Sequence, residues 1–450
     1  MFEGSLLLPL LLGTALVALA AISRATAGTW LNPTALFPLW WCFASIVPLL
    51  LASSEPVSPA AMMWVLAASL CVAAGAALGN LGLKTKLQSP GTGASVLELK
   101  ILGAAMLISI VLGMVSNVAH ALLSGVSLSD LLDLEKLVVV SNQLYVIRYA
   151  EDGAPPAPPR LAQALLPFVY LAPALGGLVF QFARSRLWKC AAIISLIPAI
   201  AVTVLQTTKA AILFAATLWF CSYFTARLRM GRLGVFTRGH LIIAGGIGVL
   251  AMLFFFAIGL ARLGTTDVGM ADVVLLKLVT AALGHMSVFS TWLAEYWQDP
   301  FEPTLGIYTF AGPRELLGMA RRIPGVFENV VDLVAGESSN VFTGFRPLIE
   351  DFGMVGALVI LTLLGFVAGL GFRNVARGNW SGAPILIAAY MTIIWTPITW
   401  FWIYNSLTMT VIATALFVWF IRAWRRGRTH AQATITTEGV LPGIVQGQGS

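Results

Sequence analysis

The sequence predicts an all-α, polytopic integral membrane protein with about 11 transmembrane helices and one large external region late in the chain. Of its 450 residues, 58% are hydrophobic and 10% are charged, whereas a soluble domain carries roughly 25% charged residues. Apolar runs close to the ~20 residues that a membrane helix needs recur along the whole chain. The predicted spans are 5–22, 36–52, 61–82, 98–118, 163–182, 188–206, 209–226, 241–261, 353–372, 382–400 and 403–421.

The distribution of lysine and arginine predicts the orientation, because short cytoplasmic loops are enriched in both. With the C-terminal tail in the cytoplasm, alternation places 17 of the 27 basic residues and two of the 20 acidic residues, Glu98 and Glu438, on the inside. The outside then holds 10 basic and 18 acidic residues. We therefore expect an external N-terminus, a first helix that is not a cleaved signal, and a disordered cytoplasmic tail over 422–450.

The external region spans 262–352, between helices 1–8 (1–261) and helices 9–11 (353–421). It carries eleven of the 20 acidic residues, so functional side chains should be concentrated there. It also contains an apolar run, 273–293. Treating this run as a span would move the acidic segment to the cytoplasm, so we expect an interfacial or partly buried helix.

Further along this region, proline-led segments indicate two short helices, 313–322 and 324–333, because proline suits the first helical turn. Arg314 and Arg321 would then share a helix face, being seven residues apart.

Several function classes lack their sequence signals. The chain has no Gly-x-x-x-x-Gly-Lys loop and no His-Glu-x-x-His or Cys-x-x-Cys pair, so neither a nucleotide, a cofactor nor a metal site is predicted. The four cysteines lie in apolar runs and are expected to be free packing thiols. The net charge of +7 reflects cytoplasmic loops and does not indicate a nucleic-acid partner.

Arginines in the external region are candidate anion ligands, because topology gives no reason for them there and guanidinium groups bind phosphate with two parallel hydrogen bonds. Simple ion pairing with nearby glutamates is the alternative. The candidates are Arg314, Arg321, Arg322 and Arg346. Lys209, which follows Thr207 and Thr208 at a predicted helix start, is either a further anion ligand or a lysine that snorkels to the interface.

Three side chains are candidates for proton transfer. His285 titrates near neutral pH, although a lone histidine in an apolar segment is commonly only a hydrogen-bonding group. Asp351 is either a carboxylate that activates a substrate hydroxyl or a structural acid at the start of the next helix. Glu350 is a further candidate for the carboxylate that activates a substrate hydroxyl.

The stretch Asn340-x-x-Thr343, followed by Asp351-Phe352-Gly353-x-x-Gly356 at the entry to a span, resembles the bacterial O-antigen polymerase family, which polymerises oligosaccharide repeat units. Thr207-Thr208-Lys209 looks like the family's Ser/Thr-then-basic element, although Arg is usual there. The resemblance implies a GT-C-like membrane glycosyltransferase of the bacterial inner membrane, with a periplasmic N-terminus. It implies undecaprenyl-diphosphate-linked glycan as substrate, and a flippase and a chain-length regulator as partners.

The resemblance also implies roles for these residues. Arg314, Arg346 and Lys209, supported by Arg321 and Arg322, would bind the diphosphate; His285, Asp351 and Glu350 would activate the acceptor; and Asn340, Thr343, Trp297 and Tyr308 would contact glycan. An O-antigen ligase, with the same donor but a lipid A core acceptor, is one alternative, and a scaffold subunit is another. A flippase is a third, but it should line its cavity with charge, which the predicted spans almost lack.

Overall fold

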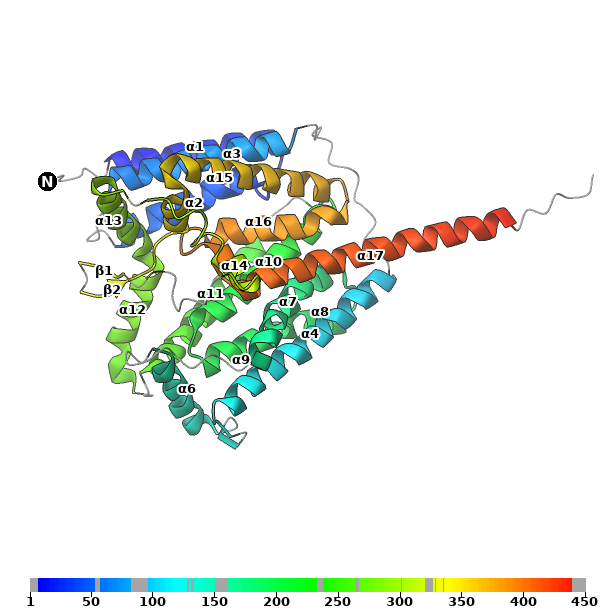
Figure 1. The fold of residues 1–450 in the computed structure, drawn as a ribbon, viewed down its shortest axis with the longest axis horizontal. Coiled ribbons are helices and arrows are strands. Elements are labelled where there is room, and N and C mark those ends of the chain that lie inside the picture. The colour runs from blue at the N-terminus through cyan, green and yellow to red at the C-terminus, as the bar shows by residue number, and fades with distance from the viewer. Residues whose placement is uncertain are drawn as a thin grey trace, which may run out of the picture.

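The computed structural model describes residues 7–52, 57–81, 96–127, 129–130, 133–149, 160–232, 238–263, 267–300, 302–319, 327, 329–334 and 336–438. These residues are nearly all helical, which confirms an all-α polytopic membrane protein. The long helices α1 (Leu7–Ala27), α3 (Pro59–Gly79), α15 (Phe345–Ala376) and α16 (Ala383–Trp395) run alongside one another (Figure 1). The helices α15 and α16 contribute to both of two large buried apolar clusters, whereas α1 and α3 contribute to one of them.

Nine helices or helix pairs among the described residues are long and apolar enough to cross a membrane. They are α1 (Leu7–Ala27), α2 (Pro33–Leu51), α3 (Pro59–Gly79), α4 (Val96–Leu123), α7 (Arg160–Phe182), α8 with α9 (Arg186–Ile194 and Ile197–Leu205), α10 (Lys209–Arg229), α15 (Phe345–Ala376) and the first part of α17 (Asn405–Glu438). A tenth is formed if the bent pair α12 (Ala271–Leu283) and α13 (His285–Gln298) counts as one span.

Two predicted spans have different outcomes. The span 241–261 lies within α11 (Arg238–Arg262), a helix of 25 residues. The span 382–400 is helical only in α16 (Ala383–Trp395), which follows the short 3-10 helix η2 (Trp380–Gly382). Thr396 still has helical dihedral angles, and the helix ends there because Pro397 has no backbone N–H to continue the hydrogen-bond pattern.

The tightest helix contact joins α3 to α15 through glycines on both helices. A Cβ atom at Gly75 or Gly79 would collide with the carbonyl oxygen of Thr362 or Phe366, and Gly365 meets α3 in the same way. Small residues spaced by four let two helix backbones approach closely in membranes. This contact fixes the position of α15, which carries several of the candidate site residues.

Basic residues gather at one end of the bundle. Arg229 Nε donates to the carbonyl of Gly378 at 3.3 Å, and its guanidinium lies 4.3 Å from the centre of the Trp380 ring. Arg373 Nη1 donates to the carbonyl of Leu81 at 2.9 Å. Loops that the charge pattern places on one side of the membrane therefore do lie together.

The opposite end, here called the hairpin end, carries the strands β1 (Val331–Asp332) and β2 (Ser338–Ser339) together with α13 (Figure 1). The strands pair antiparallel, with Val331 opposite Ser339. The helix α12 crosses this end of the bundle (Figure 1), after the 3-10 turn η1 (Val268–Met270). A bend of 58° at Gly284 separates α12 from α13.

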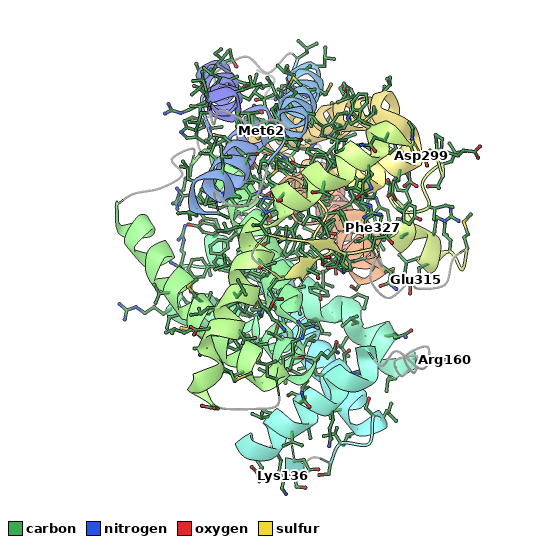
Figure 2. All side chains as sticks on the ribbon, turned by 90° about the vertical axis from the view of Figure 1, so that its left-hand side faces the viewer. Met62, Lys136, Arg160, Asp299, Glu315 and Phe327 are labelled. Carbon is green, nitrogen blue, oxygen red and sulfur yellow. The ribbon has the colours of Figure 1, made fainter. Side chains whose placement is uncertain are left out.

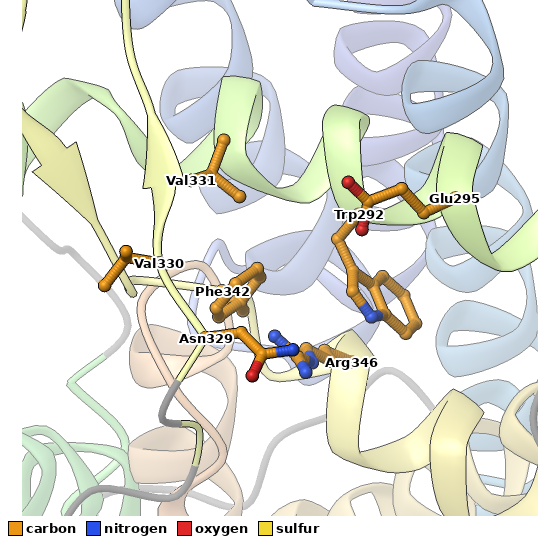
Figure 3. Close-up of a pocket in the computed structure, with 7 residues that line it drawn as sticks. All are labelled: Trp292, Glu295, Asn329, Val330, Val331, Phe342 and Arg346. Carbon is orange, nitrogen blue, oxygen red and sulfur yellow. The ribbon is translucent and has the colours of Figure 1, made fainter.

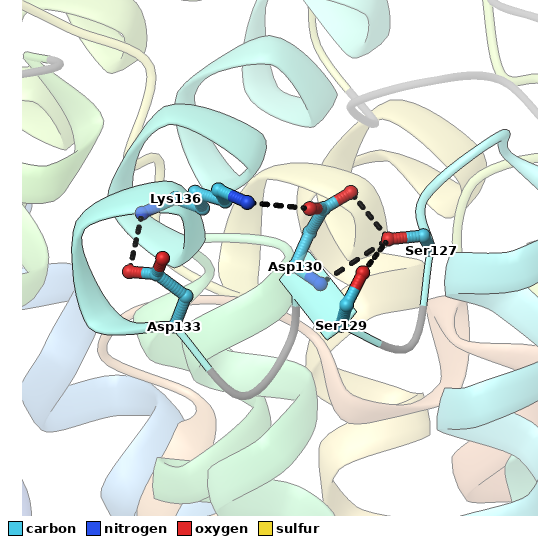
Figure 4. Close-up of polar contacts among 5 residues, drawn as sticks. All are labelled: Ser127, Ser129, Asp130, Asp133 and Lys136. Carbon is cyan, nitrogen blue, oxygen red and sulfur yellow. Dashed lines mark hydrogen bonds and ion pairs between the residues drawn. The ribbon is translucent and has the colours of Figure 1, made fainter.

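The segment after α4 leads into α6 (Leu134–Tyr149) through a set of polar contacts (Figure 4). Ser127 Oγ donates to Asp130 at 2.6 Å, and this bond is the main reason that the pKa of Asp130 is lowered. Asp133 accepts the Lys136 backbone N–H at 3.4 Å as a helix N-cap. The helix α6 then binds the carbonyls of Val204 and Arg262 through Ser141 and Asn142.

Three predictions of local structure were wrong. The helix expected over 313–322 is only α14 (Ala311–Leu316), which ends in a Schellman motif at Gly318 (φ +70°), where the N–H of Met319 binds the carbonyl of Arg314. Of 324–333, the described part is extended and includes β1. The tail expected to be disordered from 422 continues α17 to Glu438, in a segment that contains good helix formers such as Ala and Arg.

Candidate functional site

A pocket of about 390 Å³ opens at the hairpin end (Figure 3). This volume lies within the range of typical small-ligand sites. The lining residues come from α13, from the segment around β1 and from the start of α15; they are Trp292, Glu295, Asn329, Val330, Val331, Phe342 and Arg346.

Among the described residues that line the pocket, Arg346 is the only cation. Its side chain is buried, and its Nε donates to Glu350 Oε1 at 2.8 Å, one helical turn further along α15. The guanidinium lies 3.8 Å from the centre of the Phe327 ring and 3.9 Å from that of Phe342. Its Nη1 is buried and has no hydrogen-bond partner among the described residues. A buried donor left unpaired is costly, so a polar group that reached this atom would be stabilised.

An aromatic cluster holds Arg346 in place from beneath. Phe345 stacks on Trp41 with ring centres 4.5 Å apart, and it meets Trp64 edge-on at 6.0 Å. Phe289 of α13 lies 5.8 Å from the same ring. The start of α15 is thus anchored to α2, α3 and α13, which fixes the direction in which Arg346 points.

Asp351 fastens the turn before α14 to α15. Its buried carboxylate accepts the Thr304 hydroxyl and the backbone N–H groups of Tyr308 and Thr309. Its own carbonyl accepts the N–H of Leu305 at 3.0 Å. Leu305 has a left-handed conformation (φ +54°), which a non-glycine residue adopts only where the surroundings enforce it. We call this set of bonds the Asp351 clamp.

The Asp351 clamp shows that Asp351 does not cap the following helix, which is one of the roles expected from the sequence. The helix α15 already begins at Phe345, and its geometry breaks at Gly353 (φ 68°, ψ 177°). All the side-chain hydrogen bonds given for Asp351 go back to residues 304–309. The carboxylate is therefore structural, and it has little freedom to activate a substrate hydroxyl.

The clamp places Tyr308 beside the pocket. The Tyr308 ring lies 5.4 Å from Phe327, which itself covers Arg346. Burial, together with the negative charge of Glu350, raises the pKa of Tyr308 above its ordinary value. The phenol is thus protonated at neutral pH and able to donate a hydrogen bond.

Other predicted site residues have structural roles or lie apart from this lining. The His285 imidazole is buried and bonds to the carbonyl of Ala44 in α2 at 2.9 Å. The hydroxyl of Thr343 is buried and accepts the N–H of Phe345 at 3.4 Å, at the start of α15. Asn340 is exposed beside β2, and Trp297 is 59% exposed on α13.

The remaining predicted phosphate ligands are dispersed. Lys209 begins α10, and Arg262 and Lys277 each lie within electrostatic range of it. Arg314 is half-buried on α14, and its Nε has no hydrogen-bond partner in the described part of the chain. Arg321 and Arg322 lie outside the described residues.

Two polar lining residues, Glu295 and Asn329, were not among the predicted site residues. Trp292 and Glu295 are three apart on α13 and so share a face, a spacing that could have been noticed. Asn329 was missed because its segment was expected to be helical. The formal charges of Arg346, Glu350 and Glu295 sum to −1, so this pocket suits hydroxyl and amide groups better than a phosphate.

Comparison of the chain with protein-family models, curated proteins and solved structures finds no match. Among the residues that the structure describes, no group of three or more His, Cys, Asp or Glu side chains is placed to hold a metal ion. What the site can do must therefore be argued from its own side chains.

Proposed function

We propose that this protein is a membrane glycosyltransferase that polymerises undecaprenyl-diphosphate-linked oligosaccharide repeat units, for O-antigen or exopolysaccharide. It would transfer the growing glycan onto an incoming lipid-linked repeat at the periplasmic face of the bacterial inner membrane. The observation that carries the proposal is the pocket at the hairpin end. There an unpaired Arg346 N–H, the Glu295 carboxylate and the Asn329 amide converge beside the Trp292 ring.

This lining fits a sugar. Aromatic rings offer an apolar face to the C–H groups of a pyranose, while arginine, carboxylate and amide groups match its hydroxyls. Tyr308 at the edge adds a protonated phenol. The lining therefore supports Arg346 and Tyr308 as glycan contacts, and it favours a glycan role for Arg346 over the diphosphate role that the sequence predicts.

The transfer step needs a base and a place for the leaving charge. The acceptor hydroxyl oxygen would form a bond to the donor's anomeric carbon as the bond from that carbon to the diphosphate oxygen breaks. The hydroxyl proton would pass to a carboxylate, for which Glu295 and Glu350 are the nearest candidates. The departing diphosphate needs cations, and Lys209 would supply one, with Arg262 and Lys277 each within electrostatic range of it.

The first experiment is to delete the gene and compare the host's surface polysaccharide and its lipid-linked glycans with the parent's. Surface molecules capped by a single repeat, with no ladder of longer chains, are the expected result. Lipid-linked polymer that never reaches its acceptor would instead indicate a ligase, and single repeats trapped on the cytoplasmic leaflet a flippase. An unchanged profile would refute the proposal.

A further inference from the structure

The segment before and after α14 exposes an unusual number of large apolar side chains. Leu305 is 78% exposed, Leu317 75% and Met319 63%. Ile307 and Phe310 are 40% and 42% exposed. These five residues are called the apolar rim. Solvent-exposed turns rarely carry so many large apolar groups together.

The segment that carries the rim lies at the edge of the bundle. Viewed onto the hairpin end, Asp299 and Glu315, which bracket most of the rim, lie at the periphery, whereas Phe327 beside the pocket lies further in (Figure 2). Gly312 of α14 packs against the start of α17, where an added Cβ would come within 2.7 Å of the Trp402 carbonyl oxygen. The rim therefore has a fixed place beside the ends of two membrane helices.

The rim is continuous with an apolar stripe along α15. Phe310 meets Phe352 with ring centres 6.3 Å apart. Beyond Phe352, the exposed side chains Val355, Val359 and Leu363 follow one another at intervals of four residues, which places them on one face of the helix. Exposed apolar side chains along a membrane helix face lipid. The rim extends this lipid-facing surface past the break at Gly353.

We propose that the apolar rim inserts into the leaflet at the hairpin end, as an interfacial anchor beside the pocket. The bilayer is favoured as the occupant because the rim continues a surface that the span α15 already presents to lipid. The half-buried Arg314 lies within the rim segment, where a cation favours anionic headgroups. The proposal does not depend on the enzymatic activity.

The Asp351 clamp connects this anchor to the pocket. Leu305 and Ile307 belong to the turn that Asp351 holds, and Tyr308 of the same turn reaches the pocket's edge. A shift of the rim would therefore move Tyr308 relative to Glu350. Anchoring the rim keeps the pocket's edge at the membrane surface, where a lipid-borne ligand would arrive.

The test is photolabelling of the purified full chain in vesicles of phosphatidylethanolamine and phosphatidylglycerol. The vesicles would contain a trace phospholipid with a diazirine on its acyl chain, and labelled peptides would be identified by mass spectrometry. We expect residues 302–319 to be labelled several-fold more than the hairpin peptide 329–340. Their labelling should be comparable to that of the α15 stripe. An unlabelled rim beside a labelled stripe would overturn the proposal.

A matched pair of variants sharpens the result. Leu317→Asp with Met319→Asp should reduce rim labelling several-fold and leave the α15 stripe labelled as before. Val334→Asp, which changes an exposed aliphatic residue of the hairpin, should change neither. Equal rim labelling in the double variant and the parent would contradict the anchor; if the double variant fails to fold, the labelling of the unmodified chain decides alone.

Discussion

Arg346 and Glu350 form a buried ion pair across one turn of α15, with Nε and Oε1 2.8 Å apart, and yet the pair leaves Arg346 Nη1 unbonded among the described residues. A pair that served only to neutralise a buried charge would gain from satisfying every guanidinium N–H. Here the arginine also lines a pocket walled by Trp292 and Phe342. The pair is thus both a structural element and half of a binding surface.

Removing one partner of this pair should destabilise the protein strongly, because the other charge remains buried. We expect Arg346→Met or Glu350→Leu alone to cost about 3–5 kcal/mol of unfolding free energy. Thermal unfolding in detergent would measure it, as a lowered midpoint for each single variant.

The double variant Arg346→Met with Glu350→Leu separates stability from function. Replacing a buried pair by apolar groups of similar size is often neutral or stabilising, so the double variant should unfold close to the parent. It should nevertheless lose glycan extension. A stable double variant with normal extension would show that the pair has no binding role.

The Asp351 clamp should be visible as protection of the turn that it holds. In Asp351→Ala the Thr304 hydroxyl and two backbone N–H groups lose their acceptor, at about 1–3 kcal/mol for each buried group left unsatisfied. Hydrogen exchange at Tyr308 and Thr309 should accelerate, while exchange in α3 stays as in the parent. Unchanged protection of the turn would mean that the clamp is not what orders it.

The glycine contact between α3 and α15 should tolerate no side chain. Gly75→Val would drive a β-branched group into the carbonyl of Thr362, so we expect a lower unfolding temperature and loss of activity. Gly246→Ala on α11 is the matched control, because an added Cβ there meets nothing within 4 Å. The control should unfold at the parental temperature or slightly above it, since alanine is the better helix former.

The orientation of the chain is open to direct mapping. Single cysteines introduced at Asp299 and Gly336, both exposed at the hairpin end, should react with a membrane-impermeant maleimide in intact cells whose outer membrane has been permeabilised. The parent chain, with its four native cysteines, gives the background. Labelling that requires disruption of the inner membrane would place the hairpin end in the cytoplasm and remove the basis of the proposed reaction.

The membrane architecture could be predicted because hydropathy alone marks most spans. The helices α3, α7 and α10 lie where apolar runs of sufficient length stand in the sequence. The failures have local causes. α16 ends before Pro397, and α14 ends at Gly318, where a left-handed residue stops the helix. Neither the exact end of a helix nor a short hairpin is fixed by hydrophobic periodicity.

The candidate site could be predicted only in part, because it depends on contacts between distant segments. Arg346, Glu350 and Tyr308 are predicted residues that do meet. The His285 imidazole is hydrogen-bonded to the carbonyl of Ala44, 241 positions away in the sequence. No local sequence pattern reveals this contact. Asn329 lines the pocket because of how the hairpin segment folds. An asparagine at this position gives no sequence signal of a binding site.

The central claim is that this chain extends lipid-linked glycan through the Arg346 pocket. The most direct measurement places the purified protein in vesicles with undecaprenyl-diphosphate-linked repeat units from its host and separates the products on a gel. The parent chain should convert single repeats into a ladder of longer lipid-linked chains, and the stable double variant at Arg346 and Glu350 should leave them as single repeats. The same ladder from the parent and the variant, or no ladder from the parent, would contradict the account.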